Sequence, residues 1–258
     1  MNREYSMHIC TKDRINQCNG NFDIMISITN GEQINTEKIY YDYLGKRNHV
    51  ELKGNRNVGK IEVKIINKSF KNMNGIEISS VILPNKLILE RSNDNVLSVY
   101  QNSLNVYDNN RYIIVKVVGI HPDNRYTTNQ LINDPYILMN YDRDLGGSSA
   151  SVWMGVTGYN IFNYDENTPH NLQRFEIKLC DCNGDILKIQ IYNSMTDEFE
   201  EFQGFDYERI VKVNEIKGLI DANAPSEQIL EKISDLQNID YIEKIMSIDI
   251  AIKVKCLN

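Results

Sequence analysis

Alanine is almost absent from this chain, with 4 residues in 258. Because alanine is the best helix former, its scarcity argues against a mainly helical fold. Isoleucine and asparagine are abundant instead, with 35 and 33 residues respectively. Isoleucine suits the half-buried surface of a pleated sheet, and asparagine tolerates the backbone conformations of tight turns. The composition therefore predicts a mainly β protein with many turns.

The chain also lacks any apolar run approaching the roughly 20 residues that a membrane helix needs. No hydrophobic segment follows the mixed charges of residues 1–5, so we expect neither a signal peptide nor membrane insertion. A net charge of −7 disfavours nucleic-acid binding, which needs a basic surface. The five cysteines favour reduced thiols in a cytoplasm. A protein made there and later released in a particle, a spore or a surface assembly would have the same features.

The most specific pattern is a predicted β-hairpin that occurs twice. Phe22–Tyr40 contains two alternating apolar runs around the turn Asn30–Gly31, and Phe175–Tyr192 repeats the arrangement around Asn183–Gly184. Asn-Gly between alternating runs is the strongest short-range signal of a hairpin. The matching positions fit a degenerate duplication. They also fit a chance match, because hairpins use few residue types and this chain is rich in Ile and Asn. The sequence leaves both explanations open.

Alternating runs separated by turns rich in Asn, Asp and Gly recur through residues 1–120, at intervals of about 8–12 residues. This pattern stops in the segment 121–150, which carries two of the five prolines. It resumes from residue 151. We therefore predict two antiparallel, β-sandwich-like domains, at 1–120 and 151–258, joined by an irregular loop or linker at 121–150.

The second predicted domain carries the only predicted helix, near residues 226–237. Ser226 is placed to cap it, and Glu227 lies favourably in its first turn. Its apolar stripe consists of Ile229, Leu230, Ile233 and Leu236. The alternation of Phe205–Ile216 favours a strand, and Ile248–Cys256 has the clearest period-two alternation in the chain. We expect this C-terminal strand to hold down the end of the second domain.

Two short patterns resemble ligand loops but depart from them at essential positions. Gly54–Lys60 matches the start of a phosphate-binding loop, but Ile61 replaces the hydroxyl residue and a strand pattern follows where a helix is needed. We interpret this segment as a turn. Asp142 and Asp144 alternate as in a calcium loop, yet Leu145 stands where that loop needs glycine. A solvated acidic turn is the simpler interpretation, and a looser calcium site is the alternative.

Catalytic patterns are missing as well. Cys180 and Cys182 lie on one face of a predicted strand, where buried reduced thiols are commoner than a zinc site. The four histidines are scattered, and neither a His-Glu-x-x-His nor a Gly-x-Ser-x-Gly pattern accompanies them. We therefore predict no catalytic residues, no metal and no cofactor, in a protein that is not an enzyme.

The candidate binding residues are aromatic and follow the predicted linker. They are Trp153, Tyr159, Phe162 and Tyr164, with Asn and Asp residues among them. Exposed rings beside amides and carboxylates can hold the face of a sugar, and the same ring types are enriched at protein interfaces. A third interpretation places Trp153 in the core of the second domain. The sequence leaves the three open.

These expectations favour a non-enzymatic structural or interaction protein, a self-assembling subunit of a coat, an appendage, a phage or viral particle, or a crystalline inclusion. Its expected partners are copies of itself or other assembly proteins, joined through β-strand or loop contacts. Unpaired sheet edges accept further strands, and the exchanged strand would be Tyr5–Cys10 or Ile248–Cys256. The alternative function is a carbohydrate-binding module or lectin that holds a glycan with the aromatics of Trp153–Tyr164.

Overall fold

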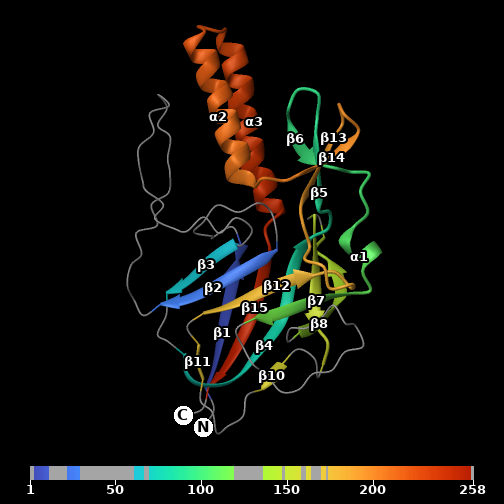
Figure 1. Cartoon of the computed structure of the whole chain (residues 1–258), viewed down its shortest axis with the longest axis vertical. Helices are drawn as coiled ribbons and strands as arrows, with labels where there is room; N and C mark the ends of the chain where they lie inside the picture. Colours follow the sequence, from blue (N-terminus) through green and yellow to red (C-terminus); the bar gives the residue numbers. More distant parts are fainter. Residues whose placement is uncertain are drawn as a thin grey trace.

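The computed structural model describes residues 3–11, 22–29, 61–66, 70–118, 136–146, 149–157, 161–163, 170–172 and 174–256. Within these ranges the protein is mainly β, with one large sheet, one small sheet and three helices. The prediction of a mainly β protein is confirmed. Figure 1 shows the large sheet at the base of the molecule, with the small sheet and two long helices above it.

The large sheet has 11 strands. They are β1 (Arg3–Cys10), β2 (Asp23–Thr29), β3 (Ile61–Ile66), β4 (Phe70–Pro84), β7 (Tyr112–Val118), β8 (Tyr136–Asp144), β9 (Ala150–Gly155), β10 (Ile161–Asn163), β11 (His170–Leu172), β12 (Arg174–Cys180) and β15 (Asp249–Cys256). Their order is β1-β15-β4-β9-β8-β7-β12-β2-β3, with β10 and β11 also paired to β4. Of these pairings, the one between β2 and β3 is parallel, and the others are antiparallel.

The large sheet curls, so that its two ends share one core. In Figure 1, β2, β3 and β12 run across the direction of β1, β15 and β4. Period-two alternation gives each strand one apolar face, as in β15, where Ile250, Ile252 and Val254 are buried. These residues belong to the same apolar cluster as Ile177 of β12. The cluster therefore lies between the two ends of a single folded-over sheet.

The expectation of two sandwich-like domains is not confirmed. Both sheets contain strands from 1–120 and from 151–258: β12 lies between β7 and β2, and β15 lies between β1 and β4. Strand β8 occupies 136–144, so this part of the predicted linker is a strand. Alternation identifies strands but not their partners, and the partners here are far apart in the chain.

The first strands of the two copies of the repeat lie side by side. Strands β2 and β12 are antiparallel neighbours, with Phe175 opposite Ile26 and Ile177 opposite Ile24. The turn at Asn183–Gly184 is confirmed, with Gly184 at a φ of 96°. The turn Asn30–Gly31 of the first copy lies outside the described residues. A duplication of sandwich domains is not confirmed, and the observed relation is strand pairing between the copies.

The small sheet consists of four strands in the order β14-β13-β5-β6. They are β5 (Ile88–Arg91), β6 (Leu97–Val99), β13 (Gln190–Asn193) and β14 (Glu198–Glu201). Strands β5 and β13 are parallel, and the other two pairings are antiparallel. A short helix, α1 (Val106–Asn109), follows β6 in the chain.

Two long helices complete the fold, α2 (Phe205–Asp221) and α3 (Ser226–Ile245). The predicted helix near 226–237 is confirmed, and it continues to Ile245. Pro225 occupies the N-cap position and no side chain caps the helix, so the role assigned to Ser226 is wrong. The predicted strand at Phe205–Ile216 is also wrong, because these residues form α2.

The buried residues of α2 explain why the sequence predicted a strand at Phe205–Ile216. Phe205, Glu208 and Lys212 are its buried positions, spaced by three and four residues as on one helix face. Because two of the three are charged, a search for apolar periodicity does not detect that face. The β-branched residues on the other positions then mimic strand alternation.

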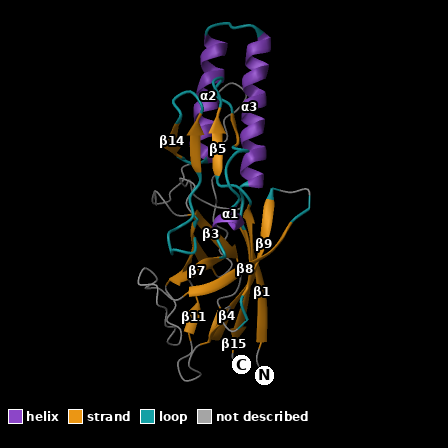
Figure 2. Cartoon of the chain, turned by 90° about the vertical axis from the view of Figure 1, so that its right-hand side faces the viewer, coloured by secondary structure: helices purple, strands orange, loops and turns teal. Residues whose placement is uncertain are grey.

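Helices α2 and α3 form an antiparallel hairpin that projects from the body beside the small sheet (Figures 1 and 2). Its base belongs to the main core through Ile239, Ile242 and Met246 of α3 and its C-cap. In the described part of the chain, no helix is both long enough and apolar enough to span a membrane.

Candidate functional site

Trp153, the centre of the predicted aromatic site, is a core residue. Its side chain is 0% exposed, and its Nε1 donates a hydrogen bond to the Ser151 hydroxyl at 3.0 Å. The Tyr141 ring packs edge-on against it, with centroids 5.8 Å apart. In this position the Trp153 ring is covered by the core, which agrees with the third interpretation given above and gives no support to a ligand-binding role.

The structure does not describe the side chains of the other three residues of that candidate site. Phe162 lies on β10 opposite Ile76 of β4, and its side chain falls outside the described features. Tyr159 and Tyr164 lie outside the described residues. The described part of the chain therefore offers no aromatic platform at Trp153–Tyr164.

The weaker sequence motifs do not form ligand sites in the described residues. Asp142 pairs with Arg143, and the Tyr107 hydroxyl donates to Asp144 at 3.4 Å. Across the described ranges, no three His, Cys, Asp or Glu side chains are grouped to hold a metal ion. Cys180 and Cys182 are free thiols, and burial raises the pKa of Cys180 to about 11. The segment Gly54–Lys60 lies outside the described residues.

The structure gathers aromatic rings elsewhere, on the outer face of the small sheet, where Phe199 is exposed and Tyr100 and Tyr192 are half-buried. Cross-strand pairing puts Phe199 beside Tyr192, Tyr192 beside Glu90, and Glu90 beside Ser98. We call this surface the aromatic face. Its residues are Ile88, Glu90, Ser98, Tyr100, Gln190, Tyr192, Phe199 and Glu201.

The three rings of the aromatic face touch one another. The Tyr100 and Tyr192 centroids are 4.7 Å apart, and those of Tyr192 and Phe199 are 5.5 Å apart. These separations are typical of favourable aromatic pairs. Phe199 is nevertheless 58% exposed, at the edge strand of the described sheet. A large ring held in an aromatic cluster and open to solvent is suited to contact a partner.

Tyr192 is held in place through its hydroxyl. Its Oη donates to the Asp197 carboxylate at 2.7 Å, across the turn that joins β13 to β14. This hydrogen bond, helped by burial and by the charge of Asp197, raises the pKa of Tyr192 to about 12. The hydroxyl therefore stays protonated near neutral pH, and the hydrogen bond persists there.

The opposite face of the small sheet packs inward. Leu89 and Ile191 are buried in the main core. Beside them, Arg91 binds the carboxylate of Glu208 on α2 with both terminal nitrogens, at 2.8 and 3.1 Å. Burial lowers the pKa of Arg91, but the hydrogen bond and charge of Glu208 raise it by more, so the guanidinium remains charged.

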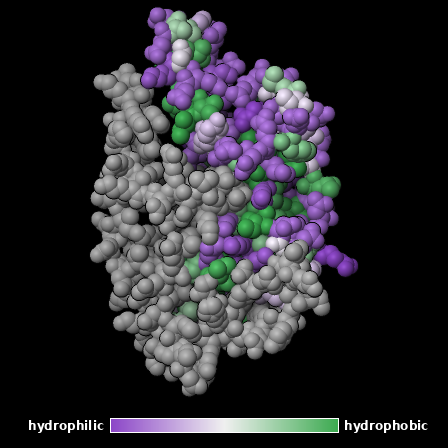
Figure 3. All heavy atoms as spheres, viewed as in Figure 1, coloured by the Kyte–Doolittle hydropathy of each residue, from purple (hydrophilic) through white to green (hydrophobic). Residues whose placement is uncertain are grey.

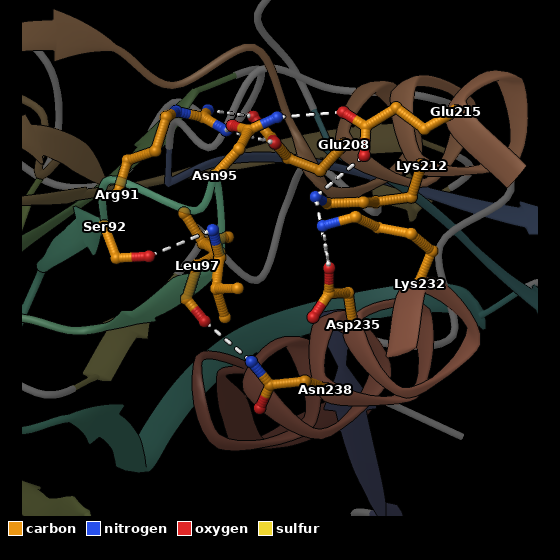
Figure 4. Close-up of polar contacts among 11 residues, drawn as sticks. Arg91, Ser92, Asn95, Leu97, Glu208, Lys212, Glu215, Lys232, Asp235 and Asn238 are labelled. Carbon is orange, nitrogen blue, oxygen red and sulfur yellow. Dashed lines mark hydrogen bonds and ion pairs between the residues drawn. The ribbon is translucent and has the colours of Figure 1, made fainter. Parts of the chain in front are cut away.

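The Arg91–Glu208 pair belongs to a larger network shown in Figure 4, which we call the anchor network. Asn95 accepts from Arg91 at 2.9 Å and donates to Glu215 at 2.9 Å. Lys212 lies 3.0 Å from Glu215 and 3.4 Å from Asp235. The full network consists of Arg91, Asn95, Glu208, Lys212, Glu215, Lys232, Asp235 and Asn238.

The charges of the anchor network balance, with three cations and three carboxylates among the residues named. Lys212 and Glu208 have side chains only 3% and 4% exposed, so each depends on its partners for compensation. Asn238 of α3 also donates to the Leu97 carbonyl of β6 at 2.7 Å. The network therefore ties both helices to the small sheet.

A second cluster joins the two helices to each other near their base. Arg209 of α2 binds Asp240 of α3 at 2.8 Å and Asp206 at 3.0 Å, and it also contacts Glu243. Together with the anchor network, this cluster holds the hairpin in one orientation relative to the small sheet. The hairpin and the sheet form a rigid arm on the large sheet.

The helical hairpin exposes apolar side chains along its outer surface. Leu230, Ile233 and Tyr241 of α3 are 63%, 37% and 62% exposed. Their spacing, with Gln237 between the last two, places them on one side of the helix, away from the buried Ile239 and Ile242. We call them the outer stripe of α3. Figure 3 shows hydrophobic residues among the hydrophilic ones on the projecting hairpin.

Comparison of the chain with protein-family models, with curated proteins and with solved structures gave no match. Function must therefore be inferred from the geometry of the described residues, which present two surfaces suited to contact, the aromatic face and the outer stripe.

A pattern in the sequence indicates the aromatic face. Tyr192 and Phe199 occupy the solvent side of alternating strands, Gln190–Asn193 and Glu198–Glu201, where polar residues are expected. Aromatic residues on the polar side of a strand therefore indicate an exposed ring more directly than Trp153 does, which follows the apolar Val152 in an apolar run.

Proposed function

We propose that this protein is a non-enzymatic structural subunit that associates with copies of itself, and that the outer stripe of α3 makes the contact. The observation that carries the proposal is an apolar stripe exposed on a projecting, rigidly held helix. A helix packed against one neighbour normally has apolar residues on one side only. Here α3 has apolar residues on two sides, and only the side with Ile239 and Ile242 is buried within the chain.

Charge favours an antiparallel pairing of two α3 helices from two copies. With Leu230 level with Tyr241 of the second copy, Glu227 is level with Lys244 of that copy. Two-fold symmetry makes this favourable pair twice. A parallel pairing would instead place Glu227 beside Glu227, which is unfavourable. The charges at the two ends of the stripe therefore suit a second copy in one orientation.

The contact is expected to be weak by itself. A stable interface buries about 1,600 Å² in total, and three exposed side chains on each helix bury far less. Association should therefore depend on concentration, or on an array in which several contacts act together. The self-assembling coat or particle expected from the sequence would provide such an array.

The C-terminal strand is less suited to exchange than the sequence suggested, whereas β1 is an edge strand of the described sheet. Strand β15 pairs on one side with β1 and on the other with β4. Donation of Ile248–Cys256 to a neighbour would require both pairings to break. The outer stripe of α3 needs no such rearrangement, so we assign the contact to the hairpin.

Light scattering over a range of protein concentrations tests the proposal. The apparent mass of the protein should rise with concentration, and the triple variant Leu230→Gln, Ile233→Gln and Tyr241→Gln should remain at the mass of a single chain. Leu104→Gln is the control, because Leu104 is 64% exposed but lies before α1. A strictly monomeric protein at the highest concentration, or equal loss in the Leu104 variant, would contradict the proposal.

A further inference from the structure

We propose that the aromatic face of the small sheet binds a polypeptide segment rich in lysine and arginine. This surface is separate from the outer stripe of α3, so its partner need not be a second copy of this chain. The proposal rests on three features of the described residues: the ring cluster, the two carboxylates on the same face, and the rigidity of its support.

The rings provide contact area that suits a cation. Tyr100, Tyr192 and Phe199 lie in one cluster on a solvent-facing sheet surface. Cationic side chains are attracted to the faces of aromatic rings, arginine more often than lysine. An extended peptide presents every second side chain to the same side. Neighbouring rings on a sheet can therefore receive successive cationic side chains.

Two carboxylates lie on the same sheet face as these rings. Glu90 lies beside Tyr192 on the aromatic face, and Glu201 of β14 shares that face. Asp197 accepts the Tyr192 hydroxyl proton at the edge of the cluster, whereas Glu198 and Glu200 alternate to the opposite face of β14. A cationic partner gains from both the rings and the carboxylates. A phosphate-bearing or acidic partner is repelled, and an uncharged sugar gains nothing from the charge.

Two cations near this face, Arg91 and Lys86, already have partners inside the chain. Arg91 is on the opposite face, bound to Glu208. Lys86 donates to the carbonyl of Gln101 at 2.6 Å, next to Tyr100, and also contacts the Ser103 carbonyl. Arg91 also lies 4.0 Å from Glu200 on that opposite face, and the two carbonyl contacts hold the Lys86 ammonium beside residues 101–103. A cationic partner can therefore supply the opposite charge for the carboxylates on this face.

The face is also preorganised. Tyr192 is fixed by its hydrogen bond to Asp197, and the sheet beneath it is tied to α2 and α3 by the anchor network. A surface that is already ordered loses little conformational entropy when a partner binds.

Binding is tested with a labelled peptide of alternating arginine and glycine, with a lysine-glycine peptide and a glutamate-glycine peptide for comparison. Fluorescence anisotropy should show binding of the arginine peptide, weaker binding of the lysine peptide and no binding of the glutamate peptide. The triple variant Tyr100→Leu, Tyr192→Leu and Phe199→Leu keeps the net charge and should weaken binding roughly tenfold. The double variant Glu90→Gln and Glu201→Gln keeps the rings and should also weaken it.

Matched controls separate a specific surface from the attraction of a protein with net charge −7 for any cation. Tyr241→Leu removes an exposed tyrosine on α3, and Glu227→Gln with Glu231→Gln removes two exposed charges there. Both controls should bind the arginine peptide like the unmodified protein. Equal binding by the ring variant and the Tyr241 control would overturn the proposal. So would ring-dependent binding of the glutamate peptide or of an uncharged oligosaccharide.

Thermal unfolding and light scattering show whether a variant has lost its fold or its self-association instead of the binding surface. Thermal unfolding must show that the ring and carboxylate variants keep the folded state. The carboxylate variant alone decides the question if the ring variant unfolds. Light scattering should show that these sheet variants associate like the unmodified protein. Failure of peptide binding therefore leaves the α3 contact intact, and failure of the α3 contact leaves peptide binding intact.

Discussion

Two charged side chains in this protein, those of Glu208 and Lys212, are almost fully buried, and their burial restricts them to contacts within the chain. Each is compensated by specific partners in the anchor network. Buried ion pairs contribute little net stability compared with apolar packing, but removal of one partner leaves an uncompensated charge. We therefore assign these residues an orienting role, which is to hold the arm in one position.

Replacement of Glu208 by alanine should lower the free energy of unfolding by roughly 3 kcal/mol, because Arg91 is left partly buried without its carboxylate. Chemical denaturation measures the change. Glu231→Ala, at an exposed position of α3, is the control and should cost no more than about 0.5 kcal/mol. The double variant Arg91→Met and Glu208→Leu should cost less than Glu208→Ala alone. Equal effects of Glu208→Ala and Glu231→Ala would contradict the anchoring role.

Cys180 should be the slowest of the described thiols to react with an alkylating reagent. It is fully buried, and with a pKa of about 11 only about one thiol in a thousand is ionised at pH 8. Cys182, half-buried in the following turn, should react faster than Cys180. Mass spectrometry of the modified sites measures both rates, and that of Cys180 should increase as the pH rises toward 11. Similar rates for the two thiols at pH 8 would contradict its burial.

Tyr192 should titrate later than an ordinary tyrosine, because Asp197 holds its proton. Its folded-state pKa, about 12, lies above the unfolded value of about 10. The stabilising effect of this hydrogen bond is therefore fully present below pH 10 and is lost as the pH rises through 12. Asp197→Asn keeps a residue suited to the left-handed backbone at this position, where φ is 58°. Ultraviolet absorbance should show one tyrosine ionising earlier in the variant, and superimposable titrations would refute the assignment.

The candidate ligand residues illustrate what the sequence could and could not predict at this scale. Rings near Asn and Asp suggested exposure for Trp153. Its side is decided by the pairing of β9 with β4, where Trp153 lies opposite Val81, and β4 is distant in sequence. Tyr192 and Phe199 become neighbours only through the pairing of β13 with β14. Residue type therefore identified suitable chemistry, and strand pairing decided where that chemistry is exposed.

At the scale of elements, local patterns identified the strands whose apolar face is continuous. Strand β15 was predicted at Ile248–Cys256 and lies at Asp249–Cys256, and α3 begins at the predicted residue. Helix α2 was missed because its inward face includes Glu208 and Lys212, whose burial depends on partners in β5 and α3. Elements stabilised by apolar periodicity were predictable, and the element stabilised by long-range ion pairs was not.

The interior position of β15 leads to a prediction about its two faces. Ile252→Ala should lower the free energy of unfolding by roughly 2–5 kcal/mol, because Ile252 is 1% exposed in the main core. Lys253→Ala, on the opposite face of the same strand, should cost no more than about 1 kcal/mol. Denaturant titration compares the variants. A negligible cost for Ile252→Ala would indicate a loosely held terminal arm, as strand exchange would require.

At the scale of the whole molecule, one curled sheet carries one rigid arm. The sequence indicated two similar halves, and the structure instead pairs the two halves within a single sheet, with β2 against β12. Such pairing joins segments about 150 residues apart, and local alternation carries no information about it. The arm presents two different surfaces, the outer stripe of α3 and the aromatic face, in a fixed relation to each other. This arrangement would let the proposed subunit contact a second copy of the chain through the outer stripe and a basic polypeptide segment through the aromatic face.

The most direct test of self-association through α3 is a charge exchange measured by analytical ultracentrifugation. Glu227→Lys and Lys244→Glu should each weaken association, because each places like charges at both ends of the antiparallel contact. The double variant should associate as the unmodified protein does, because the exchanged charges again face opposite partners. Circular dichroism should show the same helix content in all four proteins. Single variants that associate normally, or a double variant that does not recover, would contradict the antiparallel α3 contact.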